Sequence, residues 1–167
     1  MVLADRAELT QIFADVKAAA AENADTPTVL LIASHSIDSL AASTTLVRLF
    51  EDELISHKVV SITDYAELAR IYREQIVSAT ELRSIFMLNC GGIIDLMGHL
   101  QQALDEADAG EPSVRQAREL PHKDCRWYIL DSHRPYALEN VYHDPHEVRY
   151  SASGTPPLPL LRPAPAC

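Results

Sequence analysis

The 167-residue sequence predicts an α/β fold: a doubly wound, mostly parallel sheet of about five strands with helices on both faces. Short apolar runs bounded by polar residues, such as 28–33 and 84–89, are typical of strands that are buried on both faces. Longer segments between these runs carry apolar residues at helical spacing. Repeated strand–helix units of this kind form parallel sheets, and such sheets bind ligands at the carboxyl ends of their strands.

The first third of the chain is expected to contain a helix, a strand and a second helix. Asp5 and Glu8 resemble a capping box, and residues 1–25 form an N-terminal helix whose apolar face contains Leu9, Ile12, Phe13, Val16 and Ala20. Residues 28–33 form the first buried strand. The next helix runs from about Asp38 to Leu54 and is expected to bury Leu40, Val47, Phe50 and Leu54.

The same alternation continues through the middle of the chain. Residues 58–63 form a β-branched strand, and Asp64 is placed to cap a helix that buries Tyr65, Leu68, Ala69, Tyr72 and Ile76. Strand 84–89 is followed by a helix with an apolar stripe of Ile93, Leu96, Met97, Leu100 and Leu104. Residues 126–130 and 147–151 form the last two predicted strands.

Residues 1–151 are expected to form a single α/β domain, followed by a proline-rich tail over 152–167. Within the domain, residues 105–124 change from acidic to basic and form a surface excursion, in which Pro112 suits the first position of a short helix. The tail contains five prolines, which exclude a regular helix or a central strand.

The composition narrows the class of protein. The hydrophobic fraction is 47%, the charged fraction is 23% and the net charge is -10, which indicates a globular domain that does not attract nucleic acid with its whole surface. Three cysteines without C-x-x-C spacing argue against a disulfide framework or a structural zinc site and favour a reducing compartment. The longest apolar runs contain about five residues, so no membrane span is expected.

The string Asp131-Ser132-His133 follows a predicted strand and therefore lies at the ligand-binding edge of the sheet. A carboxylate and an imidazole at this edge suit manganese or zinc, which activates water against a phosphate ester. The alternative interpretation is structural: Asp131 caps the following turn and His133 packs under Pro135.

The loops after two other strands carry weaker signals. After the first strand, a metal site would need two carboxylates that reach the same ion, but only Asp38 is present and position 36 is a serine. Asp38 is explained as a helix cap. After strand 84–89, Asn89 offers an uncharged oxygen. Gly91 and Gly92 suit a tight turn or a phosphate nest.

Taken together, these strings resemble the N-terminal part of the cell division control protein 45 family, which belongs to the DHH phosphoesterase superfamily. The resemblance covers roughly 29–150. It rests on strand 29–34 with 38–42, on 88–92 with 95–96, and on 131–135 with 140–142. The last block is the most specific, because Asp-Thr/Ser-His-Arg-Pro followed by Asn-Val-Tyr is a hallmark of that family. Its members are much longer than this chain.

The resemblance implies a DHH-like domain in a nuclear replication factor that acts in replication initiation and the cell cycle. The resemblance also implies that this factor joins the minichromosome maintenance (MCM) ring and the GINS complex in the eukaryotic replicative helicase. In active DHH enzymes, two manganese ions are bound by aspartates after the first and third strands and by an Asp-His-His triplet. The matching positions here are Ser36, Asp38, Asn89, Asp131, Ser132 and His133. Half of the ligands are lost, so the resemblance implies a pseudoenzyme with no catalytic residue, metal or cofactor.

The sequence therefore favours a non-catalytic module that assembles with MCM and GINS and makes at most weak contact with single-stranded DNA. One alternative is a metal-dependent phosphodiesterase that acts on single-stranded nucleic acid or a small nucleotide through Asp38, Asp131 and His133. Another is a nucleotide-binding module that uses the Gly91-Gly92 turn, although no G-x-G-x-x-G or P-loop pattern is present.

Overall fold

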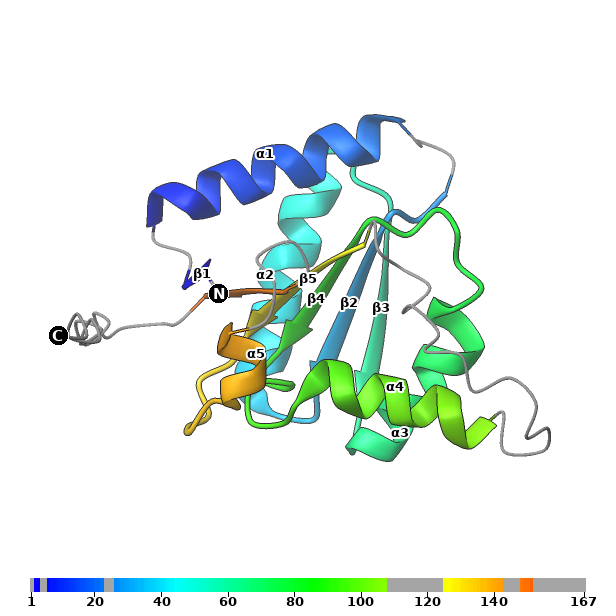
Figure 1. Cartoon of the computed structure of the whole chain (residues 1–167). Coiled ribbons are helices and arrows are strands. Elements are labelled where there is room, and N and C mark those ends of the chain that lie inside the picture. Colours follow the sequence, from blue (N-terminus) through cyan, green and yellow to red (C-terminus); the bar gives the residue numbers. More distant parts are fainter. Residues whose placement is uncertain (1, 4–5, 23–25, 108–124, 143–147, 152–167) are drawn as a thin grey trace, which may run out of the picture.

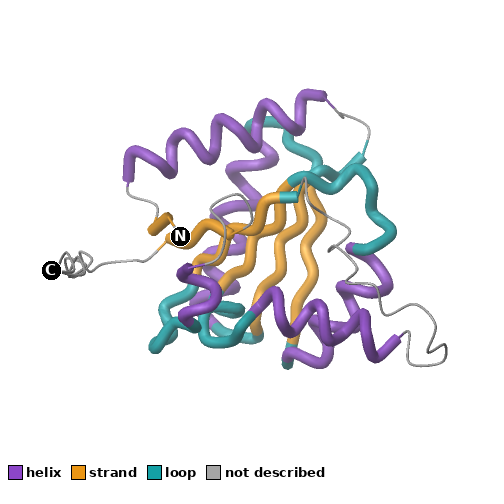
Figure 2. Tube along the Cα trace, in the orientation of Figure 1, coloured by secondary structure: helices purple, strands orange, loops and turns teal. Residues whose placement is uncertain are grey.

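The described residues form one six-stranded sheet with helices on both faces (Figures 1 and 2). The computed structural model of the chain describes residues 2–3, 6–22, 26–107, 125–142 and 148–151. The strands are β1 (Val2–Leu3), β2 (Val29–Ser34), β3 (His57–Ile62), β4 (Ser84–Leu88), β5 (Arg126–Leu130) and β6 (Val148–Ser151). The helices are α1 (Arg6–Glu22), α2 (Ile37–Asp52), α3 (Tyr65–Ile71), the π-helix η1 (Tyr72–Ile76), α4 (Leu96–Ala107) and α5 (Leu138–Tyr142).

The sheet has the strand order β1-β6-β5-β4-β2-β3, and every neighbouring pair is parallel. The predicted parallel α/β fold is therefore confirmed, and the five predicted strands correspond to β2–β6. The additional strand, β1, contains two residues and pairs with β6. The central strands β2, β4 and β5 lie side by side, so the loops that leave their carboxyl ends share one edge of the sheet.

Two apolar cores fill the spaces between the sheet and its helices. Leu30 and Ile32 of β2 face the core formed with α3, η1 and α4. Val29 and Leu31 of the same strand face the core formed with α1 and α2. Since both faces of β2 are covered, this strand needs apolar residues along its length, which accounts for its unbroken apolar run.

The helix starts confirm one predicted cap and correct another. Asp64 caps α3, because its Oδ1 accepts the Glu67 N–H at 2.7 Å. The cap of α2 is Ser36, whose Oγ accepts the Ser39 N–H at 3.1 Å. The prediction of Asp38 as this cap was wrong. Asp38 lies in the first turn, where its charge still favours the positive end of the helix dipole.

The predicted apolar face of α2 was wrong at two of its four positions. Phe50 is buried and Val47 packs against the core, but Leu40 and Leu54 are exposed. The α2 positions buried together with Phe50 are two serines, Ser39 and Ser43. The Ser39 hydroxyl donates to the Ser34 carbonyl oxygen, so small polar side chains bring α2 close to the end of β2.

Leu54 offers a test of backbone strain. It follows α2 with a φ of 57°, and its side chain is 93% exposed, so no burial offsets the left-handed conformation. We expect Leu54→Gly to raise the free energy of unfolding by about 0.5–1 kcal/mol in urea denaturation. Leu40→Gly, inside α2, should lower the free energy of unfolding by about 1 kcal/mol. A loss of stability in Leu54→Gly would contradict this account.

Several expectations lie outside the described residues. These are the capping role of Asp5, most of the 105–124 excursion including Pro112, and the tail over 152–167. Residues 105–107 of the expected excursion belong to α4. Among the helices that the structure describes, none is long and apolar enough to span a membrane.

Candidate functional site

The six positions singled out in the sequence follow three neighbouring strands. Ser36 and Asp38 follow β2, Asn89 follows β4, and residues 131–133 follow β5. Because β4 lies between β2 and β5, these loops meet at the carboxyl edge of the sheet. The convergence expected from the topology is confirmed by the hydrogen bonds that join the loops.

Three of these positions form a chain of uncharged side chains across the edge. The Asn89 Nδ2–H group donates to Ser36 Oγ at 2.9 Å. The Ser132 hydroxyl donates to Asn89 Oδ1, also at 2.9 Å. The chain is held in place from the backbone, because the Asn89 N–H donates to the Leu130 carbonyl at 2.7 Å. At three of the positions that the resemblance marks as metal-ligand positions, neutral groups bond to one another.

Asp131 is the buried charge of the site, with its side chain only 1% exposed. Its Oδ2 accepts the Gly92 N–H at 2.9 Å. Its Oδ1 accepts the His133 N–H at 2.9 Å and lies 2.7 Å from His133 Nδ1. Asp131 therefore caps the turn that follows it, as the structural interpretation expected. The His133 side chain is 56% exposed, so it does not pack under Pro135.

The paired glycines belong to the same arrangement. A Cβ on Gly92 would lie 2.8 Å from Asp131 Oδ2, so only glycine permits this approach. Gly91 has a φ of 88°, which also favours glycine. The Gly91 N–H donates to the Tyr65 hydroxyl at 3.2 Å, and the Gly92 N–H is bonded to Asp131. Both amides are thus used within the protein, and neither is available for a phosphate nest.

Asn140 completes the site, although in the sequence it stands out only as part of the Asn-Val-Tyr string. It is 2% exposed and lies in α5. Its Nδ2 donates to the carbonyl oxygens of Gly91, at 3.1 Å, and Ile94, and its Oδ1 accepts the Leu96 N–H at 3.0 Å. One side chain therefore joins α5 to the loop after β4 and to the start of α4. Only these long-range contacts reveal its role.

The donor set is a poor match for a centre of two divalent metal ions. Two divalent ions held close together need several anionic ligands. Of the six positions, only Asp38 and Asp131 carry carboxylates, and both Asp131 oxygens already accept hydrogen bonds. Within the described part of the chain, no group of three or more His, Cys, Asp and Glu side chains is arranged to hold a metal.

The buried thiols have no arrangement that activates them as nucleophiles. Burial raises the pKa of Cys90 to about 12, and burial also raises that of Cys125 to about 12. At pH 8 the thiolate fraction of such a group is only about 10⁻⁴. In a Cys167→Ser background, we expect neither thiol to react with a disulfide reagent at pH 8 until the protein is denatured. Rapid labelling of the native protein would contradict this expectation.

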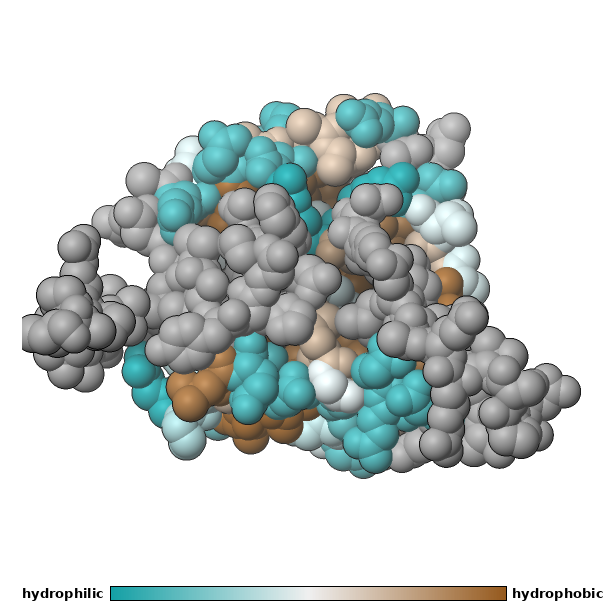
Figure 3. All heavy atoms as spheres, in the orientation of Figure 1, coloured by the Kyte–Doolittle hydropathy of each residue, from teal (hydrophilic) through white to brown (hydrophobic). Residues whose placement is uncertain are grey.

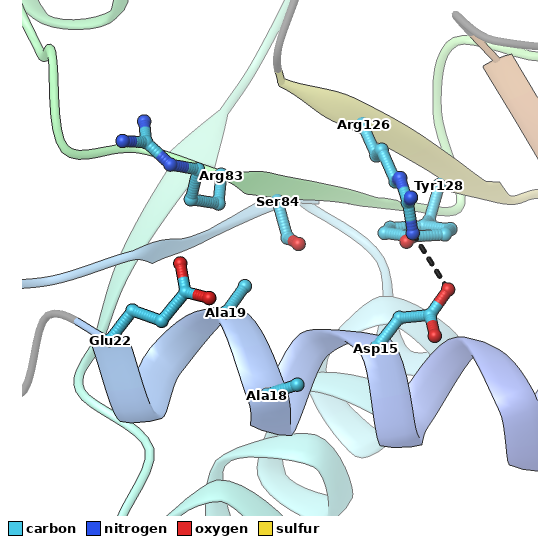
Figure 4. Close-up of a pocket in the computed structure, with 8 residues that line it drawn as sticks. All are labelled: Asp15, Ala18, Ala19, Glu22, Arg83, Ser84, Arg126 and Tyr128. Atoms are coloured by element: carbon cyan, nitrogen blue, oxygen red, sulfur yellow. Dashed lines mark hydrogen bonds and ion pairs between the residues drawn. The ribbon is translucent and has the colours of Figure 1, made fainter.

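A hollow of about 310 Å³ lies at the opposite end of the sheet (Figure 4). It is lined by α1 and by the starts of β4 and β5, with Glu22 and Asp15 on one side and Arg83 and Arg126 on the other. Arg126 pairs with Asp15 at 2.7 Å and so ties α1 to β5. None of the six predicted positions lines this hollow, and ligands of doubly wound sheets bind at the other end of the strands. The carboxyl edge therefore remains the candidate site.

Known proteins share this sequence pattern and this fold. The family model described as CDC45 matches residues 29–150. The cell division control protein 45 homolog of Dictyostelium discoideum is 26% identical over 144 residues, which cover 86% of this chain and 19% of the relative. Cell division control protein 45 of Saccharomyces cerevisiae is 32% identical over 120 residues, covering 68% of this chain and 17% of that protein.

A crystal structure of CDC45 from Entamoeba histolytica shares the fold, with a TM-score of 0.65 at 21% identity. The match covers 87% of this chain and 24% of that chain. This chain therefore spans less than a quarter of the length of these relatives. The family model covers β2 to β5 and every position of the candidate site, which confirms the resemblance noted in the sequence. The chain belongs to the CDC45 family of cell division control proteins.

Proposed function

We propose that the chain is a non-catalytic replication module: a degenerate DHH phosphoesterase domain that helps to assemble the eukaryotic replicative helicase with the MCM ring and the GINS complex in the nucleus. One observation is the main support for the proposed loss of catalytic activity. The uncharged chain of Ser36, Asn89 and Ser132 occupies the positions at which active relatives hold metal. Membership of the CDC45 family supports the role in replication.

The chemistry that remains is insufficient for phosphodiester hydrolysis. A two-metal enzyme uses its ions to activate water and to stabilise the leaving oxygen. Here the buried carboxylate of Asp131 is bonded to Gly92 and His133, and the Asn89 amide oxygen carries no charge to offset a dication. The site instead joins the loops after β2, β4 and β5 into one firm edge. Such an edge is suited to a scaffold.

The overall charge supports protein partners over nucleic acid. With 24 acidic and 14 basic residues, the chain repels a phosphate backbone at long range and attracts basic protein surfaces. Contact with single-stranded DNA is therefore expected to be weak and to fade as the salt concentration rises. Nanomolar binding of single-stranded DNA at physiological salt would contradict this part of the proposal.

Thermal unfolding with and without about 1 mM Mn²⁺ tests the loss of the metal site. A site with a Kd of about 10 μM would add about 2.7 kcal/mol of stability, which raises the Tm of a domain of this size by about 5–10 °C. We expect no such shift in the native protein and no Mn²⁺-dependent hydrolysis of single-stranded DNA or dinucleotides. A shift of that size that disappears in Asp131→Ala would instead support the phosphodiesterase alternative.

A matched gain-of-ligand variant makes a negative result informative. The triple variant Ser36→Asp, Asn89→Asp, Ser132→His returns carboxylates and an imidazole to the motif positions. These three side chains are already linked by hydrogen bonds of 2.9 Å, so the new ligands would be close enough to share ions. We expect this variant to show a larger Mn²⁺-dependent Tm shift than the native protein. Binding of the native chain to purified MCM ring and GINS complex then tests assembly directly.

A further inference from the structure

Exposed apolar side chains gather at the carboxyl edge of the sheet, where a phosphoesterase would present its substrate site. Ile37 and Leu40 of α2 are 85% and 68% exposed. Ile93, in the loop after β4, is 48% exposed, and Leu138 of α5 is 64% exposed. These four residues are called the apolar edge below. Large apolar side chains that lie exposed next to one another mark interaction surfaces more often than isolated ones do.

Hydrogen bonds between the loops place the four residues at the same end of the sheet. Ile37 follows Ser36, which is bonded to Asn89, and the Leu40 N–H donates to the Ser36 carbonyl at 3.0 Å. On the other side, the Ala137 N–H donates to the Gly92 carbonyl at 2.9 Å, so the next residues, Ile93 and Leu138, flank that bond. Figure 3 shows hydrophobic surface along this lower end of the molecule, beside and below the position of α5 in Figure 1.

The charges around the apolar edge are nearly all negative. The segments at this end of the sheet are 34–40, 62–67, 89–96 and 131–140. They contain one basic residue, Arg134, and six acidic ones: Asp38, Asp64, Glu67, Asp95, Asp131 and Glu139. Of these, Glu67 is paired with Arg70 at 3.4 Å. Asp131 is buried, but Asp38, Asp64, Asp95 and Glu139 are exposed. The carboxyl edge is thus more acidic than the chain as a whole, which has 24 acidic and 14 basic residues.

We propose that the apolar edge docks an amphipathic segment of a partner subunit whose apolar side chains are flanked by Lys and Arg. The inference deepens the proposed assembly function and rests on it. A second copy of the chain would bring the same acidic rim against this one, and like charges juxtaposed in an interface are unfavourable. Nucleic acid would be repelled for the same reason. A basic amphipathic segment would bury the apolar side chains and pair its Lys and Arg residues with the carboxylates.

Variants that change the surface without changing the fold provide the test. Ile37→Ser with Leu138→Ser removes apolar surface, and Asp38→Lys with Glu139→Lys reverses charge at the rim, all at exposed positions. The controls are Leu54→Ser for the apolar change and Asp52→Lys with Glu51→Lys for the charge change. These exposed residues lie at the far end of α2 or, for Leu54, two residues beyond it. Thermal unfolding should show that all of these variants are folded.

The first arm uses a synthetic amphipathic Leu/Lys helix as the probe, with a Leu/Glu helix of the same apolar pattern for comparison. We expect both edge variants to bind the Leu/Lys helix at least fivefold more weakly than the native chain, whereas each control changes its Kd less than twofold. Equal losses in the edge variants and their charge-matched or apolar-matched controls would overturn the inference. So would equal binding of the Leu/Glu helix by the native chain.

The second arm measures binding to purified MCM ring and to purified GINS complex. The proposed docking at the apolar edge is supported if both edge variants bind at least one of these complexes at least tenfold more weakly than the native chain does, while the controls do not. Native binding that every variant retains overturns the apolar edge and leaves the assembly function standing. Absence of native binding to both overturns the assembly function, while the peptide arm still reports on the edge. A native dimer that dissociates in the Ile37→Ser, Leu138→Ser variant would show that a second copy is the occupant, which also overturns the proposal.

Discussion

Asp131→Ala is expected to lower the free energy of unfolding by about 3 kcal/mol, because the carboxylate holds two loops together from a buried position. Its removal leaves the Gly92 N–H without its acceptor, and the His133 N–H loses its partner as well. Each unsatisfied buried donor costs about 1–3 kcal/mol, and bonds to a charged acceptor lie at the upper end of that range. Urea denaturation followed by circular dichroism measures the difference.

Two matched variants separate the carboxylate from its surroundings. Ser132→Ala removes a single exposed hydroxyl bond to Asn89 and should cost less than about 1 kcal/mol. Gly92→Ala keeps Asp131 but forces a Cβ to within 2.8 Å of its Oδ2, so it should cost at least about 2 kcal/mol. If Asp131→Ala were no more destabilising than Ser132→Ala, the carboxylate would not be holding the loops, and a functional role for its charge would need to be sought.

The expected loss of stability in Asp131→Ala affects the interpretation of binding measurements made with this variant. If Asp131→Ala weakens binding to helicase subunits, the same preparation must be compared below its unfolding transition. A variant that is folded and still fails to bind would point to direct contact by the Asp131 loop. Binding that recovers at low temperature, where the variant is folded, would show that the residue acts by maintaining the proposed docking edge.

Much of the fold could be predicted from the sequence, because its strands are buried on both faces. The runs 29–33 and 85–88 have no polar position, which only a central strand of a covered sheet tolerates. The parallel order then brings the ends of β2, β4 and β5 together. The strand β1 was not predicted because its two residues are too few to show a period.

The errors arose where burial depends on distant parts of the chain. Leu40 and Leu54 have the helical spacing of a core face, but α2 approaches the sheet through Ser39 and Ser43. Hydropathy does not distinguish a serine that packs closely from one that faces solvent. The hydrogen bonds among Ser36, Asn89 and Ser132 could likewise not be predicted from the sequence. The topology predicted only that the loops containing these residues lie close together.

Asn140→Ala is expected to cost about 3 kcal/mol, the second large effect at this edge. The buried amide makes three hydrogen bonds, to the Gly91 and Ile94 carbonyl oxygens and to the Leu96 N–H. Alanine would leave these backbone groups unsatisfied in a site from which the protein excludes water. The exposed neighbour Glu139→Ala is the control and should change stability by less than about 0.5 kcal/mol. A similarly small loss in Asn140→Ala would mean that water replaces the amide.

The double variant Asp131→Ala, Asn140→Ala shows whether the edge behaves as one unit. Both side chains hold the same short segment, since Asp131 bonds to Gly92 and Asn140 bonds to the residue before it. If the segment is already released by one substitution, the second should cost less, and the sum of the single effects should exceed the double effect by about 0.5–3 kcal/mol. Strict additivity would mean that the two contacts act independently. A coupled edge would mean that the Asp131 carboxylate and the Asn140 amide act together to hold these loops.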